Sequence, residues 1–224
     1  MMNEAHDGLR RCIRTRRLGQ RVLPAAHDAG VRYLAMEALN PVFAAEANAT
    51  REVPSAAGGY LAQPEMREFI AAALGLGWWL LSYEADFSLQ PPGFERRSRE
   101  ATNWREEQQA RNLLAALEAL PADQRLLVWC GNHHLAKLSL DEEWLPMGCR
   151  FQQLSGIEPF AIDQIVSVEF GDREPYALRW VKSCATELEA SGGAAGFLSE
   201  EAPDGWPSRE IADAFVLAVD NALT

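Results

Sequence analysis

The chain contains three short apolar runs of strand length, and a helical pattern of apolar positions precedes each of them. Strands are expected at 31–37, 78–84 and 127–130, and helices at 7–29, at 64–74 and from Thr102 or Asn103 to Leu120. Pro64 suits the first turn of its helix, and Gly30 suits the end of the helix before it. Strands that alternate with helices in this way are typical of a parallel sheet with crossover connections.

Less regular patterns complete the expected fold. Loops are expected at 90–97 and at the glycine-rich 190–196, a loop or partly helical excursion at 40–60, a helix from His134 to about Trp144, and strands at 161–170, 176–181 and 214–219. We therefore predict an α/β fold of three layers, with a mostly parallel sheet and crossover helices, in a single domain that spans residues 1–224.

The start of the chain departs from this pattern. Glu4 and His6 stand directly before the first helix, and the pattern predicts no strand ahead of them. Each other polar group at a predicted strand end follows its own strand. We therefore expect the first strand to be missing at the N-terminus, and the natural chain to begin further upstream.

The charge of the protein narrows the classes of partner. A net charge of −11 at pH 7 argues against binding to nucleic acid or to an anionic membrane surface, since both require a basic footprint. A small molecule or a peptide is the substrate class that remains. The oligomeric state is left open by the composition.

The cysteines and the hydropathy indicate a compartment. The four cysteines are scattered without a CxxC pair, which favours reduced thiols over a disulfide framework or a zinc ribbon. No apolar run reaches the roughly 18 residues of a membrane-spanning helix, and the start of the chain does not resemble a signal peptide. We expect a cytoplasmic protein.

Polar groups follow the three best-defined strands. Glu37 ends the first, Glu84 ends the second, and the segment Gly131–His134 follows the third. The carboxyl ends of parallel strands lie on one edge of a sheet, where α/β proteins bind ligands. An acid at a strand end is more often solvated or paired with a helix terminus, but the set together predicts a site.

Glu106 adds a fourth element to this set. It begins a stripe at helical spacing that is otherwise apolar, so its carboxylate is expected on the core side of its helix, where it needs a partner. Arg105 is one candidate for that partner. The alternative is that Glu106 caps the helix or interacts with its dipole from the first turn.

Five short segments, in order, resemble one known superfamily. It unites the erythromycin esterases, the ChaN haem-binding lipoproteins, the TraB proteins and the Tiki metalloproteases, and it is marked by two GxxH motifs with a glutamate between them. The matching segments are Asn3-Glu4-Ala5-His6, Gly30–Leu39, Tyr83-Glu84, Arg105–Asn112 and Gly131-Asn132-His133-His134. Asn3 stands where the first motif has glycine; the second motif is intact.

The resemblance implies the roles of individual residues. It places His6, Glu37 and His134 at the core of a catalytic or metal site, with Arg105 and Glu106 as catalytic support. The motif residues beside them are expected to contact a bound cofactor or substrate; they are Glu4, Tyr83, Glu84 and His133, the last of which could instead face a packing helix.

Three functions are consistent with these residues. The first is a hydrolase in which His6, Glu37 and His134 activate water against an ester, lactone or peptide carbonyl, with or without zinc or manganese, while Arg105 stabilises the oxyanion. The second is a haem- or metal-binding protein without turnover, as the ChaN branch implies. The third is an inactive member of the superfamily. A serine triad is disfavoured, because the chain has no GxSxG motif.

Overall fold

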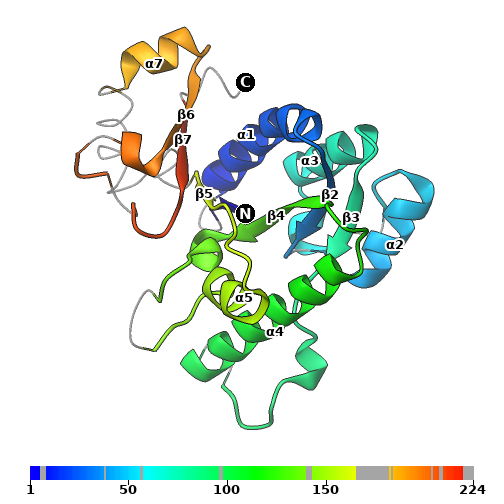
Figure 1. Cartoon of the computed structure of the whole chain (residues 1–224). Helices are drawn as coiled ribbons and strands as arrows, with labels where there is room; N and C mark the ends of the chain where they lie inside the picture. The colour runs from blue at the N-terminus through cyan, green and yellow to red at the C-terminus, as the bar shows by residue number, and fades with distance from the viewer. Residues whose placement is uncertain are drawn as a thin grey trace.

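The computed structural model shows an α/β fold in which helices cover both faces of a seven-stranded sheet (Figure 1). It describes residues 1–5, 9–37, 39–55, 58–95, 98–139, 143–164, 182, 184–202, 204–206 and 209–218. The strands are β1 (Met2–Glu4), β2 (Val31–Met36), β3 (Trp79–Ser82), β4 (Arg125–Gly131), β5 (Ile162–Asp163), β6 (Ala194–Leu198) and β7 (Ala214–Ala218). The α-helices are α1 (Leu9–Asp28), α2 (Pro41–Thr50), α3 (Pro64–Gly75), α4 (Arg99–Glu118), α5 (Met147–Ser155) and α7 (Ala185–Ala190).

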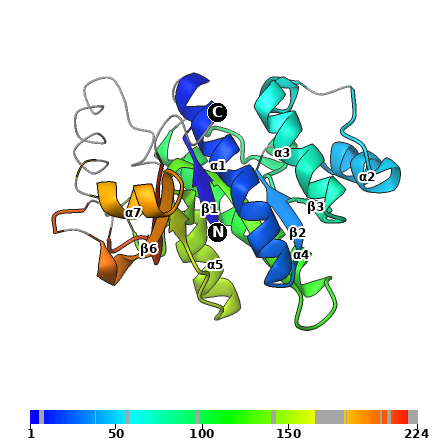
Figure 2. The ribbon, with the colours of Figure 1, turned by 90° about the horizontal axis from the view of Figure 1, so that it is seen from above.

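The sheet order is β3-β2-β4-β1-β5-β7-β6, and every pairing is parallel except that of β6 with β7. From β1 the chain moves toward β3 through α1 and α3, and it returns toward β5 through α4 and α5. Right-handed crossovers that run in opposite directions place their helices on opposite faces. Figures 1 and 2 show this arrangement, with α1 and α3 on one face and α4 and α5 on the other.

Side chains alternate between two cores, one on each face of the sheet. In β4, Leu127 and Trp129 belong to the cluster beneath α1 and α3, whereas Val128 and Cys130 belong to the cluster beneath α4 and α5. Successive side chains of a strand point to opposite faces of the sheet, so residues two apart share a core. Because helices cover both faces of the sheet at β4, its sequence is apolar at consecutive positions.

The predicted three-layer α/β class is confirmed, but the first strand is not missing. Residues Met2–Glu4 form β1 in the middle of the sheet, and Asn3 pairs with Cys130 of β4. Three residues are too few to produce a recognisable alternation. Pairing with strands on both sides supplies the order that the local sequence does not encode.

Two helices also differ from the expectation. Helix α4 begins at Arg99 with Ser98 as its N-cap, earlier than Thr102, because the Ser98 hydroxyl accepts from the backbone of Ala101. After His134 the expected helix is replaced by a single turn, η3 (Asn132–Leu135), and the next helix is α5.

The glycine-rich segment expected as a loop contributes β6, since β7 provides an antiparallel partner. The strand expected at 214–219 is found as β7, whereas 165–181, which holds most of one expected strand and all of another, lies outside the described residues. Within the part of the chain that the structure describes, no helix is both long enough and apolar enough to cross a membrane.

A close contact between α1 and β4 gives a test of the core. A Cβ atom on Gly19 would lie 2.5 Å from Cη2 of the Trp129 indole, which is buried and rigid. We predict that Gly19→Ala lowers the free energy of unfolding by about 1–3 kcal/mol, the usual cost of overpacking. Chemical denaturation measures the change.

The matched control is Gly75→Ala at the end of α3, where an added Cβ meets no atom within 4 Å. It should leave stability unchanged or raise it by up to about 1 kcal/mol. Equal denaturation midpoints for Gly19→Ala and the unmodified protein would contradict the packing of Trp129 against α1.

Candidate functional site

The carboxyl edge of the sheet carries a charged cluster centred on Arg105. Glu37 follows β2, Glu84 follows β3, and Arg105 lies in α4 on the adjoining face. The Arg105 Nη2 atom donates to both carboxylates, and Nε donates to Oε1 of Glu84 at 3.0 Å. One guanidinium therefore joins three separate elements.

Glu37 is oriented through both of its oxygens. Oε1 accepts from Arg105, and Oε2 accepts from the backbone N–H of Gly131 at 2.8 Å. The carboxylate is only 10% exposed. It is consequently held against the end of β4, directly beside the turn that carries the histidines.

His134 lies between two carboxylates. The turn η3 brings its Nε2 to 3.9 Å from Oε1 of Glu37 and its Nδ1 to 2.7 Å from Oε1 of Glu106. The contact with Glu106 has ion-pair distance without the alignment of a hydrogen bond. The side chain of His134 is 14% exposed, so it reaches the solvent only at one side.

Glu106 is fully buried and accepts hydrogen bonds from a distant segment. The indole of Trp144 donates to Oε1 at 3.0 Å, and the backbone N–H of Met147, at the start of α5, donates to Oε2 at 2.6 Å. Its position on the core side of its helix is as expected. It lies in the third turn of α4, and it caps α5 instead of its own helix.

The carboxylates determine the charge of His134. Burial lowers the pKa of its imidazole, but the nearby Glu37 and Glu106 carboxylates outweigh that effect and raise the pKa from 6.5 to about 9. The Arg105 guanidinium opposes them with a smaller effect. The imidazole is therefore protonated at neutral pH, which differs from the neutral base expected from the sequence.

A small cavity adjoins the cluster. It has a volume of about 100 Å³, and its lining includes Glu37, Glu84, Arg105 and Gly131, with Tyr60 from the turn η1 (Gly59–Ala62). Cavities for drug-sized ligands measure about 300–1,000 Å³. This one has room for water and a small reacting group.

The remaining predicted site residues lie elsewhere or have other contacts. His6 lies outside the described residues. Glu4 lines the same small cavity, but it is buried and pairs with Arg16 at 2.9 Å, and the Trp129 indole donates to the same oxygen. His133 is exposed.

Tyr83 packs in the core and does not line the cavity. Its hydroxyl donates to the backbone carbonyl of Trp129, and only 1% of the residue is exposed. Desolvation raises the pKa of Tyr83 well above its ordinary value, so the phenol stays protonated. It fixes the spacing between β3 and β4 beneath the cluster.

Sequence reasoning missed a buried polar network at the same edge. The Asn3 amide donates to Oδ1 of Asp163 at 2.9 Å and to the carbonyl of Asn132 at 2.8 Å, and its Oδ1 accepts from the backbone of Gln164. Asp163 gave no signal because it falls inside an expected longer strand. This network ties β1, β5 and the histidine turn together.

The described residues do not form an obvious metal site. Among them, no group of three or more His, Cys, Asp or Glu side chains could hold a metal ion. His134 and Glu37 are close together, but the third expected ligand, His6, is not among the described residues. Arg105 already places a cation against Glu37 and Glu84.

Comparisons with known proteins find a distant structural likeness only. No protein-family model and no curated protein matches the chain. The chain is similar to a structure described as bacterial protein toxins, with a TM-score of 0.48, 13% identity, and coverage of 73% of this chain and 33% of that one. It is also similar to RRSP, a MARTX toxin effector domain from Vibrio vulnificus, with a TM-score of 0.47, 18% identity, and coverage of 73% and 32%.

A further bacterial toxin structure matches with a TM-score of 0.48, 15% identity, and coverage of 72% of this chain and 32% of that one. This chain thus spans about a third of the length of the matched structures. The expected membership of the erythromycin esterase, ChaN, TraB and Tiki superfamily is wrong, because the structural neighbours are toxin domains and no family model matches. Likenesses this distant assign no activity.

The charge of His134 has a measurable effect on stability. Because its folded-state pKa of about 9 exceeds the ordinary 6.5, the stabilisation is fully present below pH 6.5 and is lost as the pH rises through about 9. We predict a loss of about 3 kcal/mol over this range from this group. Denaturant unfolding at several pH values measures it.

The unmodified protein is compared with His134→Gln, in which the loss of stability between pH 6.5 and about 9 should be absent. His133→Gln is the matched control, because the neighbouring side chain is exposed and its replacement should leave the pH dependence intact. An NMR titration that places the pKa of His134 near 6.5 would refute the assignment.

Proposed function

We propose that the protein is a hydrolase in which Glu37 activates a water molecule and the charged His134 stabilises the oxyanion that forms. The observation that carries this proposal is the position of Glu37, which lines a cavity and whose carboxylate lies 3.9 Å from Nε2 of His134. The substrate class is an ester, a lactone or a peptide with a small group at the reacting carbonyl.

The two groups are close enough to share one water. Two hydrogen bonds of about 2.8 Å can meet at a single oxygen above a gap of this size. One Glu37 oxygen accepts from Arg105 and the other accepts from Gly131, and an ionised carboxylate can accept several hydrogen bonds through its two oxygens. A water bound there can give its proton to Glu37 as it attacks.

His134 suits the stabilising role better than the role of a base. An imidazolium has no free lone pair to accept a proton, but it can donate a charge-assisted hydrogen bond to a developing oxyanion. Glu106 holds the far nitrogen, so Nε2 is the atom available for the substrate. Glu106 is thus a positioning residue.

Arg105 receives a different role from the one expected. Its hydrogen bonds go to Glu37 and Glu84, so it orients the base instead of meeting the oxyanion. The guanidinium fork fits two carboxylates, which a lysine could not do with the same geometry. Gln109 adds a hydrogen bond to Glu84 at 3.0 Å and supports the arrangement.

The reaction balances with these groups alone. Glu37 takes one proton from water while the water oxygen bonds to the carbonyl carbon, which produces an oxyanion beside His134. The C–O or C–N bond then breaks, and the proton held by Glu37 passes to the departing alcohol or amine. The products are a carboxylic acid and an alcohol or amine.

Three alternatives to the metal-free hydrolase remain as outcomes of the test. A divalent metal would need ligands beyond Glu37 and His134, and it would have to compete with the positive charge of Arg105. Haem is at least drug-sized, so the cavity of about 100 Å³ offers no support for it. An inactive protein would keep the geometry and hydrolyse nothing.

We predict that Glu37→Gln abolishes hydrolysis of small aryl esters or peptides, with a loss of about 10²–10⁴ in kcat, because the base is removed and the shape is kept. Turnover is measured on a panel that includes p-nitrophenyl acetate and short acyl peptides. The matched control is Glu46→Gln on α2, an exposed acid away from the cluster.

The same assay separates the alternatives. Activity that survives chelation favours the metal-free mechanism, and activity that chelation removes and zinc or manganese restores favours a metal. Hydrolysis by Glu37→Gln at the rate of the unmodified protein would contradict the proposal. The absence of turnover by the unmodified protein on every substrate of the panel would also contradict it.

We also predict that kcat falls as the pH rises through about 9, because His134 then loses the proton that stabilises the oxyanion. In Glu106→Gln this alkaline limb should move to lower pH, since one of the two carboxylates that raise the pKa of His134 is gone. A pH–rate profile of both proteins measures the shift, with melting curves to verify folding. An unmoved limb would contradict the proposed coupling.

A further inference from the structure

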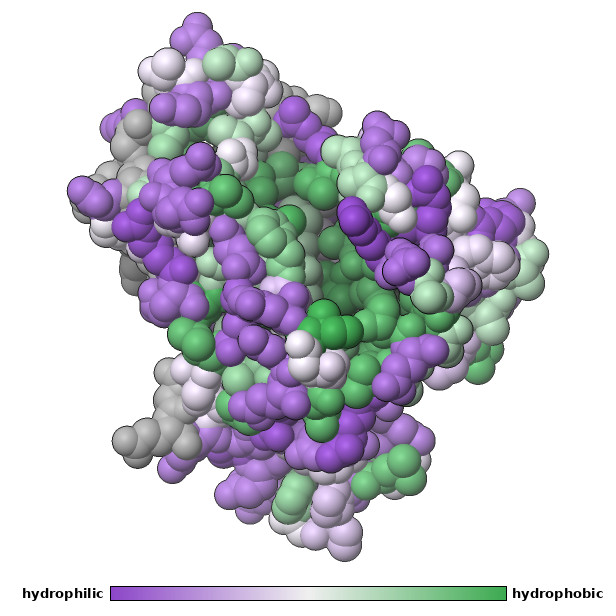
Figure 3. All heavy atoms as spheres, viewed as in Figure 1, coloured by the Kyte–Doolittle hydropathy of each residue, from purple (hydrophilic) through white to green (hydrophobic). Residues whose placement is uncertain are grey.

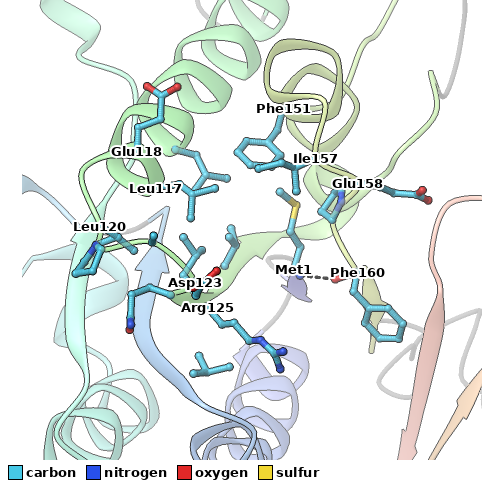
Figure 4. Close-up of a pocket in the computed structure, with 18 residues that line it drawn as sticks. Met1, Leu117, Glu118, Leu120, Asp123, Arg125, Phe151, Ile157, Glu158 and Phe160 are labelled. Atoms are coloured by element: carbon cyan, nitrogen blue, oxygen red, sulfur yellow. Dashed lines mark hydrogen bonds between the residues drawn. The ribbon is translucent and has the colours of Figure 1, made fainter.

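The two edges of the sheet carry cavities that differ in size and in lining. The cavity at the amino edge measures about 760 Å³ and is lined mainly by apolar side chains (Figure 4). The face drawn in Figure 3 is hollowed near its centre, where hydrophobic side chains gather. The cavity at the carboxyl edge measures about 100 Å³. Because Glu37 lines this smaller cavity, it is the one that limits a substrate of the candidate site.

The small cavity has a charged wall and an apolar wall. The charged wall is the cluster centred on Arg105, and the apolar wall is formed mainly by Tyr60, Met66 and Trp129. Met66 is fully buried and Trp129 is 2% exposed, whereas Tyr60 is 39% exposed. Tyr60 is therefore the part of the apolar wall that lies at the mouth of the cavity.

Arg16 holds the Tyr60 ring in place. The Cζ atom of the Arg16 guanidinium lies 5.6 Å from the centre of the ring, within the range of a cation–π contact. Arg16 is fully buried, and it donates to Glu4 from Nε at 2.9 Å and to the Gln63 side chain from Nη1. The backbone N–H of Gln63 also donates to the carbonyl of Tyr60 at 3.1 Å, which closes the turn η1. The ring thus has a defined position at the mouth of the cavity.

We propose that Tyr60 limits the length of the acyl group that the candidate site accepts, so that the substrates are esters and amides of short apolar acids such as acetic, propionic and butyric acid. This inference rests on the proposed function and adds a substrate class to it. Tyr60 is a specificity residue in this proposal and takes no part in the chemical step.

The position of Glu37 gives the acyl group its direction. Glu37 lies 3.9 Å from Nε2 of His134, where the oxyanion forms, and it also lines the small cavity. When the attacking water comes from Glu37 and the oxyanion lies at His134, two substituents of the tetrahedral carbon remain. The leaving group has to take a proton and depart, so it faces the solvent. The acyl chain is the substituent that enters the cavity and contacts its apolar wall.

The volume of the cavity sets the length of that chain. A water molecule has a share of about 30 Å³ in the liquid, and a methyl or methylene group is similar in size, so the cavity of about 100 Å³ holds roughly three such groups. Three groups beyond the carbonyl carbon correspond to a butyryl chain. A hexanoyl chain would have to displace the Tyr60 ring, which would break its contact with Arg16.

We predict that Tyr60→Ala shifts the acyl preference toward longer chains. The kcat/KM for p-nitrophenyl hexanoate, relative to that for p-nitrophenyl acetate, should rise about tenfold or more, the scale on which apolar pockets discriminate between chain lengths. Tyr60→Phe keeps the ring and should retain the preference of the unmodified protein. Melting curves verify that each variant is folded.

The matched control for Tyr60→Ala is Trp79→Ala. Trp79 is also a half-exposed ring that contacts an arginine, since the Cζ atom of Arg51 lies 5.4 Å from its centre, but it does not line the small cavity. Its replacement removes the same kind of contact and should leave the ratio of the two kcat/KM values unchanged.

Alkylboronic acids test the acyl pocket without turnover. A boronic acid can take up the water that Glu37 activates, with the proton passing to Glu37, and become a tetrahedral anion beside His134. We expect the unmodified protein to bind propylboronic acid more tightly than hexylboronic acid, because the longer chain meets Tyr60. In Tyr60→Ala this order should be reversed, and calorimetry measures both affinities.

The outcomes separate this inference from the proposed function. If the unmodified protein hydrolyses the acetate ester and Tyr60→Ala moves neither the ester nor the boronic acid preference, the role of Tyr60 is overturned and the hydrolase proposal stands. If no ester is hydrolysed but Tyr60→Ala reverses the boronic acid preference, the hydrolase proposal is overturned and the acyl pocket is supported. The absence of both turnover and boronic acid binding would overturn both.

Discussion

The double ion pair of Arg105 is the interaction on which the arrangement of side chains at the carboxyl edge of the sheet depends. Glu37 and Glu84 come from different strands, and two half-buried carboxylates so close together repel each other unless a cation lies between them. The guanidinium supplies that charge from α4, and its planar fork also restricts where each carboxylate can point. With one oxygen held by Arg105, the other oxygen of Glu37 reaches the Gly131 amide, and the base consequently stands beside His134.

The sequence allowed the members of this cluster to be predicted, but not their pairings. Glu37, Glu84 and His134 follow recognisable strands, and the geometry of a parallel sheet brings such ends together. Glu106 was detectable because helical spacing placed it on the buried face. Its partners Trp144 and Met147 belong to a segment about 40 residues later, and no local pattern indicates that contact. The role of Arg105 likewise depends on side-chain directions that only the assembled fold determines.

The two strands that sequence reasoning missed, β1 and β6, share a physical cause. β1 has three residues and β6 begins in a glycine-rich stretch, so neither has the length or composition of a typical strand. Both are ordered by neighbours: β1 by β4 and β5, and β6 by β7. Buried side chains add to this support, because Asn3 binds Asp163 and the backbone of Gln164. Local propensity is a weak guide where pairing and burial supply the stability.

The two edges of the sheet are connected through β1, and its shortness makes that connection consequential. Met1 lies at the amino edge, among the residues that line a cavity of about 760 Å³, while Glu4, three residues later, is buried, pairs with Arg16 and lines the small cavity beside the candidate site. β1 is paired with β4 on one side and with β5 on the other, so a change in its pairing affects both edges of the sheet. Because Asn3, its middle residue, also binds Asp163 and the Asn132 carbonyl, the position of the histidine turn depends on the same three residues.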